Sequence, residues 1–267
     1  MRIEPNISQV GALFGESSRA AILTVLLDGC SLPAGELARA AGVSATAASG
    51  HLAKLVRGGL LAVEAEGRHR YYRLAGPAVA AVIEDLAELA GRPALLNSPN
   101  LSAAAKALRL ARSCYDHLAG ELAVAISAAL EQRKYLVRGE GKRYNIGGEA
   151  GRQWFTRQGI DLNSLRPARY GVARQCLDWT ERRPHLAGPL GAKLFTSWCD
   201  AGWLRRHPVQ PRLVEVTALG RRKLQEAIGI SLEPVQIHHS FAPDKVLRCN
   251  DHPLFSSSGF HKQSFRG

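Results

Sequence analysis

The chain has 267 residues, which is enough for two domains or three small ones. Its apolar content of 46% and charged content of 22% are ordinary for a globular protein and exclude a disordered chain. No apolar run reaches membrane-spanning length, and the N-terminus lacks the features of a signal peptide, so we expect a cytosolic protein. Five cysteines, an odd number, do not predict a disulfide framework.

The net charge of +12 is distributed unevenly along the chain. Residues 1–96 carry 9 Lys/Arg and 9 Asp/Glu, whereas residues 97–267 carry 26 and 14. A basic excess confined to one part of a chain indicates a polyanionic partner, most often nucleic acid. The alternative is that the charge only keeps the protein soluble.

The first ninety residues predict three helices followed by a hairpin. Apolar residues recur at helical spacing from Glu16 until Gly29, and a second helix begins near Pro33. A third helix spans residues 44–58, with Ser44 as its N-cap. Two alternating strands, LLAVEAEG and RHRYYRL, then form a hairpin over residues 61–74. This order of elements predicts a winged helix-turn-helix.

The segment VSATAASGHLAKLVRGGLLAVEAEGRHRYYRL resembles the signature of the ArsR/SmtB family of bacterial winged-helix repressors. The resemblance rests on the Val-Ser turn, the Ser-x-His-Leu tract and a wing closing in Tyr-Tyr-x-Leu, and it covers roughly residues 10–90. It implies a homodimer bound to double-stranded operator DNA. Short hydroxyl side chains at a helix start can reach base edges, and wing arginines can reach phosphates. The DNA-contacting residues implied are Ser44, Thr46, Ser49, His51, Lys54, Arg68 and Arg70.

Members of this family commonly sense metals through a Cys pair before the recognition helix, or through Asp/His clusters in the last helix. The first region here contains only Cys30, and the last, GPAVAAVIEDLAELAG, contains no His. Neither family metal site is therefore present.

The helix from Pro77 to Leu89 is expected to form a dimer interface together with a helix around Ile7–Leu13. For His51, local packing is the alternative to base contact.

The remainder of the chain predicts two copies of one pattern. His117 corresponds to His185 at an offset of 68 residues, and Gly151 to Gly220 at an offset of 69. Each copy consists of a leading segment, a helix, a hairpin and a closing helix, which resembles a degenerate winged helix. The fold class predicted for the whole chain is mainly α with small β hairpins (α+β). The predicted divisions are residues 1–92 (DNA binding and dimerisation), 93–103 (linker), 104–168 (first copy), 169–234 (second copy) and 235–267 (a disordered tail).

The segments CYDHLAG and CLDWTERRPHLAG occupy the same place in the two copies. Their thiols and imidazoles can form a zinc site, although the spacing is not a standard one; the metal candidates are Cys114, His117, Cys176 and His185. The same residues can instead form a catalytic Cys–His pair, a thiol pair or a helix-entry motif. The insertion WTERRP favours an effector pocket between the copies. The effector-site candidates are Cys114, Asp116, His117, Cys176, Asp178, Trp179, Glu181, Arg182, Arg183 and His185.

We therefore expect a nucleoid-associated transcriptional regulator, a repressor, that binds operator DNA as a homodimer. Its C-terminal half would sense a small ligand, a thiol redox state or a metal, and no other cofactor, no catalytic residue and no membrane partner is expected. Two alternatives belong to other classes of protein. One is an enzyme with a fused winged-helix domain, which requires an open cleft at His117 and His185. The other is a protein that binds nucleic acid without sequence preference.

Overall fold

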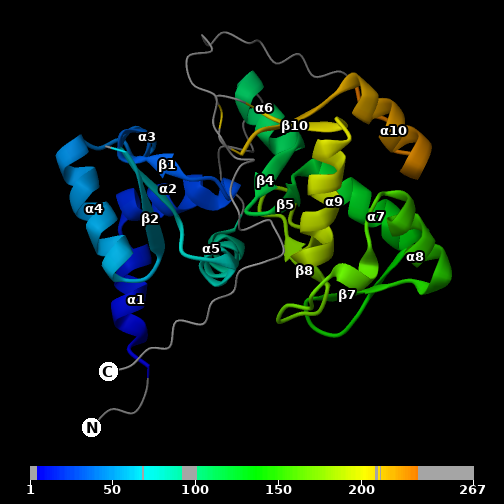
Figure 1. Ribbon diagram of the computed structural model, residues 1–267, viewed down its shortest axis with the longest axis horizontal. Helices are drawn as coiled ribbons and strands as arrows, with labels where there is room; N and C mark the ends of the chain where they lie inside the picture. The colour runs from blue at the N-terminus through cyan, green and yellow to red at the C-terminus, as the bar shows by residue number, and fades with distance from the viewer. Residues whose placement is uncertain (1–4, 68, 92–100, 208–209, 211, 234–267) are drawn as a thin grey trace.

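The computed structural model describes residues 5–67, 69–91, 101–207, 210 and 212–233. The predicted tail lies outside the described residues, as does most of the predicted linker. The N-terminal part, residues 5–91, is called the head below, and residues 101–233 are called the module; they lie side by side (Figure 1). No single described helix is long and apolar enough to cross a membrane, although the bent pair Ile7–Phe14 and Ser17–Asp28 meets that test together.

The head consists of five helices, a 3-10 turn and a small antiparallel sheet of order β1-β3-β2. Its buried core, which includes Ile22, Leu37 and Leu55, is formed between the helices and the sheet. Helices α3 and α4 form the helix-turn-helix, and β2 and β3 form the wing, so the predicted winged helix is confirmed. The elements are α1 (Ile7–Phe14), α2 (Ser17–Val25), η1 (Leu26–Asp28), β1 (Leu32–Pro33), α3 (Ala34–Ala41), α4 (Ala45–Arg57), β2 (Leu61–Glu66), β3 (His69–Leu74) and α5 (Pro77–Ala90).

Local chemistry sets the ends of the head's helices. Gly42, with a φ of 65°, ends α3, and Ser44 starts α4 by accepting a hydrogen bond from the amide of Ala47 at 3.2 Å. Pro77 occupies the first turn of α5, where its missing N–H costs nothing. Glu16 caps α2, and hydrogen bonds from the amides of Ser18 and Arg19 lower the pKa of its carboxyl to about 2.

The module begins with one helix and then shows the order hairpin, helix, hairpin, helix twice. In each copy the leading segment of the sequence is a hairpin of short strands. A helix-turn-helix pair does not occur in the described part of either copy, so the resemblance to a winged helix is limited to the hairpin and closing helix. The elements are α6 (Ala103–Leu110), β4 (Arg112–Cys114), β5 (His117–Ala119), α7 (Glu121–Gln132), β6 (Leu136–Arg138), β7 (Arg143–Ile146), α8 (Gly148–Arg157), η3 (Leu162–Ser164), β8 (Ala173–Leu177), β9 (Pro184–Ala187), α9 (Gly188–Asp200), β10 (Leu204–Arg206), β11 (Val214–Val216) and α10 (Ala218–Ile228).

Hairpins of one copy pair with hairpins of the other. The second hairpin of the first copy joins the first hairpin of the second copy in a four-stranded sheet of order β6-β7-β8-β9. In the reciprocal position, β4 lies beside β11 through a bridge between Arg112 and Leu213. Helix α7 packs on β9, and α9 packs on β5. The copies therefore share one hydrophobic core, to which Leu122, Leu190 and Trp198 all belong. That they arose by duplication stays a prediction.

Candidate functional site

The first candidate site is the outer surface of α4. Its inner face, which includes Leu52 and Leu55, is buried in the core of the head. The predicted DNA-contacting residues Thr46 and Lys54 are exposed on the outside. Arg57, in the last turn, is exposed as well and extends the same surface. Arg57 was not among the residues predicted to contact DNA, although its spacing of three residues from Lys54 places both on one face.

Three other predicted contacts on α4 already have partners within the head. The Ser44 hydroxyl caps the helix, and the Ser49 hydroxyl donates to the carbonyl of Ala45 at 3.0 Å. The Nδ1 atom of His51 lies 3.2 Å from a carboxylate oxygen of Glu16, and the side chain is half-buried. These partners orient the three side chains, and contact with DNA stays a prediction for each.

The wing carries the remaining predicted contacts. Arg70 is exposed on β3, and Arg68 lies outside the described residues. Glu64, whose charge would oppose a phosphate backbone, forms an ion pair with Arg73 at 2.9 Å. The pairing partly neutralises the acidic charge of the wing.

The second candidate site is a buried cluster of two cysteines and two histidines. In the hairpin β4-β5, Cys114 is paired directly opposite His117, and in β8-β9, Cys176 is paired directly opposite His185. One atom from each of the four side chains lies within 4.8 Å of the other three. All four residues are 3% exposed or less. The fold thus brings together the four residues that the sequence named as metal candidates, and they do not line an open cleft.

The imidazole rings have a defined orientation in this cluster. The Nε2 atoms of His117 and His185 face each other at 3.1 Å. The Nδ1 atom of His117 lies 3.0 Å from Asp116, in hydrogen-bond contact. The Nδ1 atom of His185 points towards Asp178 at 3.9 Å and has no hydrogen-bond partner among the described residues. Each ring therefore directs Nε2 inwards and Nδ1 towards a carboxylate.

Charges in the cluster are strongly coupled. The hydrogen bond with Cys176 lowers the pKa of the Cys114 thiol well below its usual range and raises that of Cys176. Burial opposes a charged His117, but its hydrogen bonds with Asp116 and Cys114 raise its pKa to about 10. Burial lowers the pKa of His185.

Asp178 is the centre of a buried polar network at the edge of the cluster. One of its oxygens accepts from the Arg112 guanidinium and from the Gly120 amide, both at 2.7 Å, and the other accepts from Thr180 at 2.6 Å. The Trp179 ring lies over the Arg112 guanidinium at 4.3 Å. Burial opposes the charge on Asp178, but the Arg112 charge holds the pKa of this carboxyl below its usual range.

The rest of the WTERRP insertion also contacts the protein itself. Glu181 forms two hydrogen bonds with Arg109, at 2.8 and 3.1 Å. Arg182, with a φ of 53°, donates to the carbonyl of Glu88 on α5 at 2.9 Å, and Arg183 is exposed. The insertion therefore connects the second copy to α6 of the module and to α5 of the head. Binding of an effector by these residues stays a prediction.

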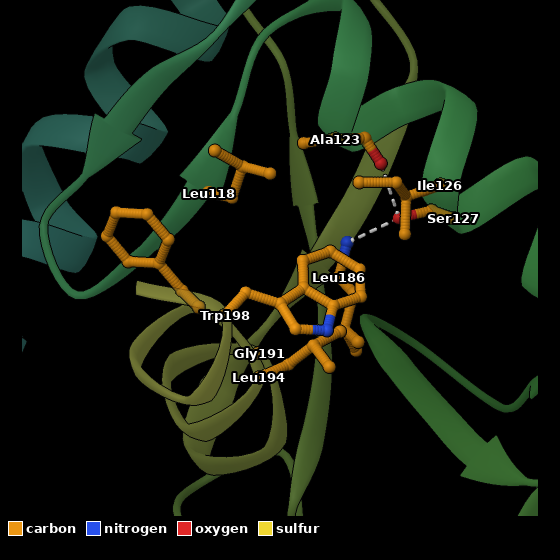
Figure 2. Close-up of a pocket in the computed structure, with 9 residues that line it drawn as sticks. Leu118, Ala123, Ile126, Ser127, Leu186, Gly191, Leu194 and Trp198 are labelled. Atoms are coloured by element: carbon orange, nitrogen blue, oxygen red, sulfur yellow. Dashed lines mark hydrogen bonds between the residues drawn. The ribbon is translucent and has the colours of Figure 1, made fainter. Parts of the chain in front are cut away.

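A cavity between α7 and α9, where the two copies meet, is too small for an organic effector. Its volume is about 20 Å³, which is room for about one water molecule. Figure 2 shows its apolar lining, with Leu118, Leu186 and Trp198 around it. The hydroxyl of Ser127 is used within the protein, because it accepts from the Leu186 amide at 2.8 Å and donates to the carbonyl of Ala123.

The cluster contacts the head at two points. Glu84 of α5 is buried and lies 3.3 Å from the sulfur of Cys114 and 2.8 Å from the guanidinium of Arg174. Burial raises the pKa of Glu84 to about 7. Tyr115, in the turn between β4 and β5, packs against the core of the head, and its amide donates to the carbonyl of Leu27. Glu84 could not be predicted from the sequence, since its helix carries the pattern of an ordinary amphipathic helix.

Comparison with known proteins identifies the family. A helix-turn-helix domain family matches residues 14–64. The uncharacterized HTH-type transcriptional regulator YdfF of Bacillus subtilis is 37% identical over 230 residues, which cover 86% of this chain and all of that protein. The chain belongs to the HTH-type transcriptional regulators. For the head of this HTH-type regulator, the resemblance to the ArsR/SmtB family is confirmed.

Solved structures are similar to about a third of this HTH-type regulator. The homodimeric winged helix-turn-helix DNA-binding domain of Mb0332 from Mycobacterium bovis, a possible ArsR-family regulator, is 30% identical. It covers 34% of this chain and 90% of its own length, with a TM-score of 0.30. Reduced HlyU from Vibrio cholerae is 35% identical over 31% of this chain and 86% of its own, with a TM-score of 0.29.

Proposed function

We propose that this HTH-type regulator binds operator DNA as a homodimer and represses transcription from it. The observation that carries the proposal is the exposed outer face of α4, on which Thr46, Lys54 and Arg57 lie opposite the buried core residues. A helix that presents short polar and basic side chains in this way suits the major groove, where bases are read and phosphates flank the helix. The wing, with Arg70 exposed, supplies a second contact.

Exposed apolar side chains on α1 and α5 support a dimer. On α1, Ile7 is 76% exposed, and on α5, Leu89 is 83% exposed. Val10, Val82 and Leu86 extend the two apolar surfaces. A second copy of the chain would cover them, and a twofold dimer would place two α4 helices on the two halves of a palindromic operator.

A direct contact between the module and α5 supports control of the spacing of the two heads by the module. Glu84 lies on α5, one of the two dimerisation helices proposed, and contacts the Cys/His cluster directly. A change in the cluster would therefore act on α5, and through it on the dimer. Enclosure of the cluster disfavours the enzyme alternative, because a substrate needs access to the reacting sulfur.

The proposal is tested by binding to DNA selected from a random duplex library. We expect a preferred palindromic sequence and a steep loss of affinity with salt. Lys54→Ala should lower affinity and reduce the slope of log K against log salt by about 1, because one phosphate contact is lost. Lys193→Ala, at an exposed position on α9 in the module, is the matched control and should leave binding unchanged.

Two results would contradict the proposal. Equal affinity for the selected and random duplexes would support the alternative of binding without sequence preference. Unchanged binding by Lys54→Ala would show that the outer face of α4 does not contact DNA.

A further inference from the structure

We propose that Cys114, His117, Cys176 and His185 form a closed, tetrahedral zinc site that joins the two copies of the module. The inference goes beyond the proposed function, since it concerns metal binding by the chain alone and does not depend on operator DNA. It rests on the donor atoms, their distances, the orientation of the two rings and the burial of the site.

The donor atoms match zinc in kind and in distance. Two thiolates and two imidazoles are a common ligand set of structural Zn²⁺ sites. In a tetrahedron with Zn–N bonds of about 2.0 Å the two nitrogens lie about 3.3 Å apart, and with Zn–S bonds of about 2.3 Å the two sulfurs lie about 3.8 Å apart. The Nε2 atoms of His117 and His185 are 3.1 Å apart, and the four donor atoms lie within 4.8 Å of one another. A zinc ion requires only small shifts of these side chains.

The orientation of the two rings suits a metal ion between them. Two Nε2 lone pairs at 3.1 Å repel each other unless a proton or a metal ion lies between them. Metal-bound histidines usually donate their other N–H to a carboxylate, which fixes the tautomer that binds the metal. Asp116 accepts in this way from Nδ1 of His117 at 3.0 Å, and Asp178 lies 3.9 Å from Nδ1 of His185. The carboxylates follow the cysteines at the same distance in sequence, so both halves of the site have the same construction.

Charge balance and closure also suit a zinc ion. Two thiolates and two neutral imidazoles neutralise Zn²⁺, so the occupied site carries no net charge into the interior. Four protein ligands leave no open position for water or substrate, which makes the site structural in type. Its unusual spacing, Cys-x2-His and Cys-x8-His, is explained by the hairpins, since direct pairing across two strands brings each Cys next to its His.

The experiment is a metal analysis of the full-length protein, purified under reducing conditions. We expect one zinc ion per chain, for which the protein competes with a colorimetric zinc chelator. After removal of zinc and addition of Co²⁺, we expect the visible absorption of tetrahedral cobalt and a thiolate-to-cobalt charge-transfer band. Less than one tenth of an equivalent of zinc in the reduced protein, with no charge-transfer band after Co²⁺ is added, would overturn the proposal. A Cys114–Cys176 disulfide in protein that cannot be loaded with metal after reduction would overturn it as well.

Variants separate loss of the site from loss of the fold. Cys176→Ser should lower zinc affinity at least tenfold, whereas Cys199→Ser, at a cysteine outside the cluster, should keep one zinc per chain. His185→Cys preserves four ligands, so it should still bind one zinc and should intensify the charge-transfer band by adding a third thiolate. Equal zinc affinity of Cys176→Ser and the parent protein, measured by competition with the chelator, would contradict the assignment. Because no DNA is used, failure here leaves the proposed operator binding intact, and the reverse also holds.

Discussion

At the scale of single residues, Asp178 shows how burial is compensated. Its side chain is fully buried, and its two oxygens accept hydrogen bonds from Arg112, Gly120 and Thr180. Arg112 is 2% exposed and belongs to β4, so the ion pair links the two copies of the module. Breaking a buried pair by removing one partner leaves the other as an uncompensated charge, which is far more destabilising than losing a surface pair.

Asp178→Asn should therefore lower the free energy of unfolding by about 3–5 kcal/mol, because the Arg112 charge stays buried without its counter-ion. The measurement is urea unfolding in the presence of a metal chelator, so that zinc does not contribute to the difference. Glu181→Gln is the control: its pair with Arg109 is only partly buried, and its loss should cost about 1 kcal/mol or less. Equal effects of the two substitutions would show that the buried Arg112 pair stabilises the module no more than the partly buried Arg109 pair does.

At the scale of elements, the helices and strands of the head could be predicted from the sequence, whereas the hairpins that begin the two copies could not. Helical spacing of apolar residues, with Ser44 as an N-cap, was enough to predict α3 and α4, and alternation was enough to predict the two strands of the wing. Strands β4 and β5 contain three residues each, which is too short for an alternating pattern to be recognised. The Cys/His cluster depends on the approach of β5 to β9, which tertiary packing brings about and local sequence does not encode. The sequence could therefore name the four residues but could not decide between a metal site, a thiol pair and a helix-entry motif.

The exposed apolar surfaces of α1 and α5 give a prediction at the same scale. Leu89→Glu should convert the dimer to a monomer, because it places a charge at the most exposed apolar position of α5. Light scattering after size-exclusion chromatography measures the change in mass, and operator affinity should fall with it. Leu219→Glu, at an exposed leucine of α10 in the module, is the matched control and should remain dimeric. A Leu89→Glu protein of unchanged mass would show that the dimer forms elsewhere.

At the scale of the whole molecule, part of the basic excess lies away from α4. Helix α4 lies on the outer side of the head, while α8 lies at the opposite end of the module (Figure 1). The sequence predicted a polyanionic partner from the charge of residues 97–267. In the folded chain, part of that charge is used internally: Arg112, Arg174 and Lys142 all pair with carboxylates.

This arrangement predicts that charge on α8 acts on DNA binding only weakly. The double substitution Arg152→Gln/Arg157→Gln, at exposed positions of α8, should leave the salt slope of operator binding unchanged, whereas Lys54→Ala reduces it by about 1. The measurement is a titration with labelled operator at several salt concentrations. A slope reduced by about 2 in the α8 variant would show that the module lies on the phosphate backbone.

The pairing of hairpins from distant parts of the chain has a consequence for the order of folding during synthesis. When Cys114 and His117 leave the ribosome, the head is already complete, and Tyr115 can dock on it at once. The other half of the cluster follows only with residues 176–185, after the whole first copy has been made. Until then α7 also lacks β9, the strand of the second copy on which it packs, so part of its apolar surface stays uncovered. Chains arrested between residues 120 and 176 would thus present a finished DNA-binding head joined to an unfinished module.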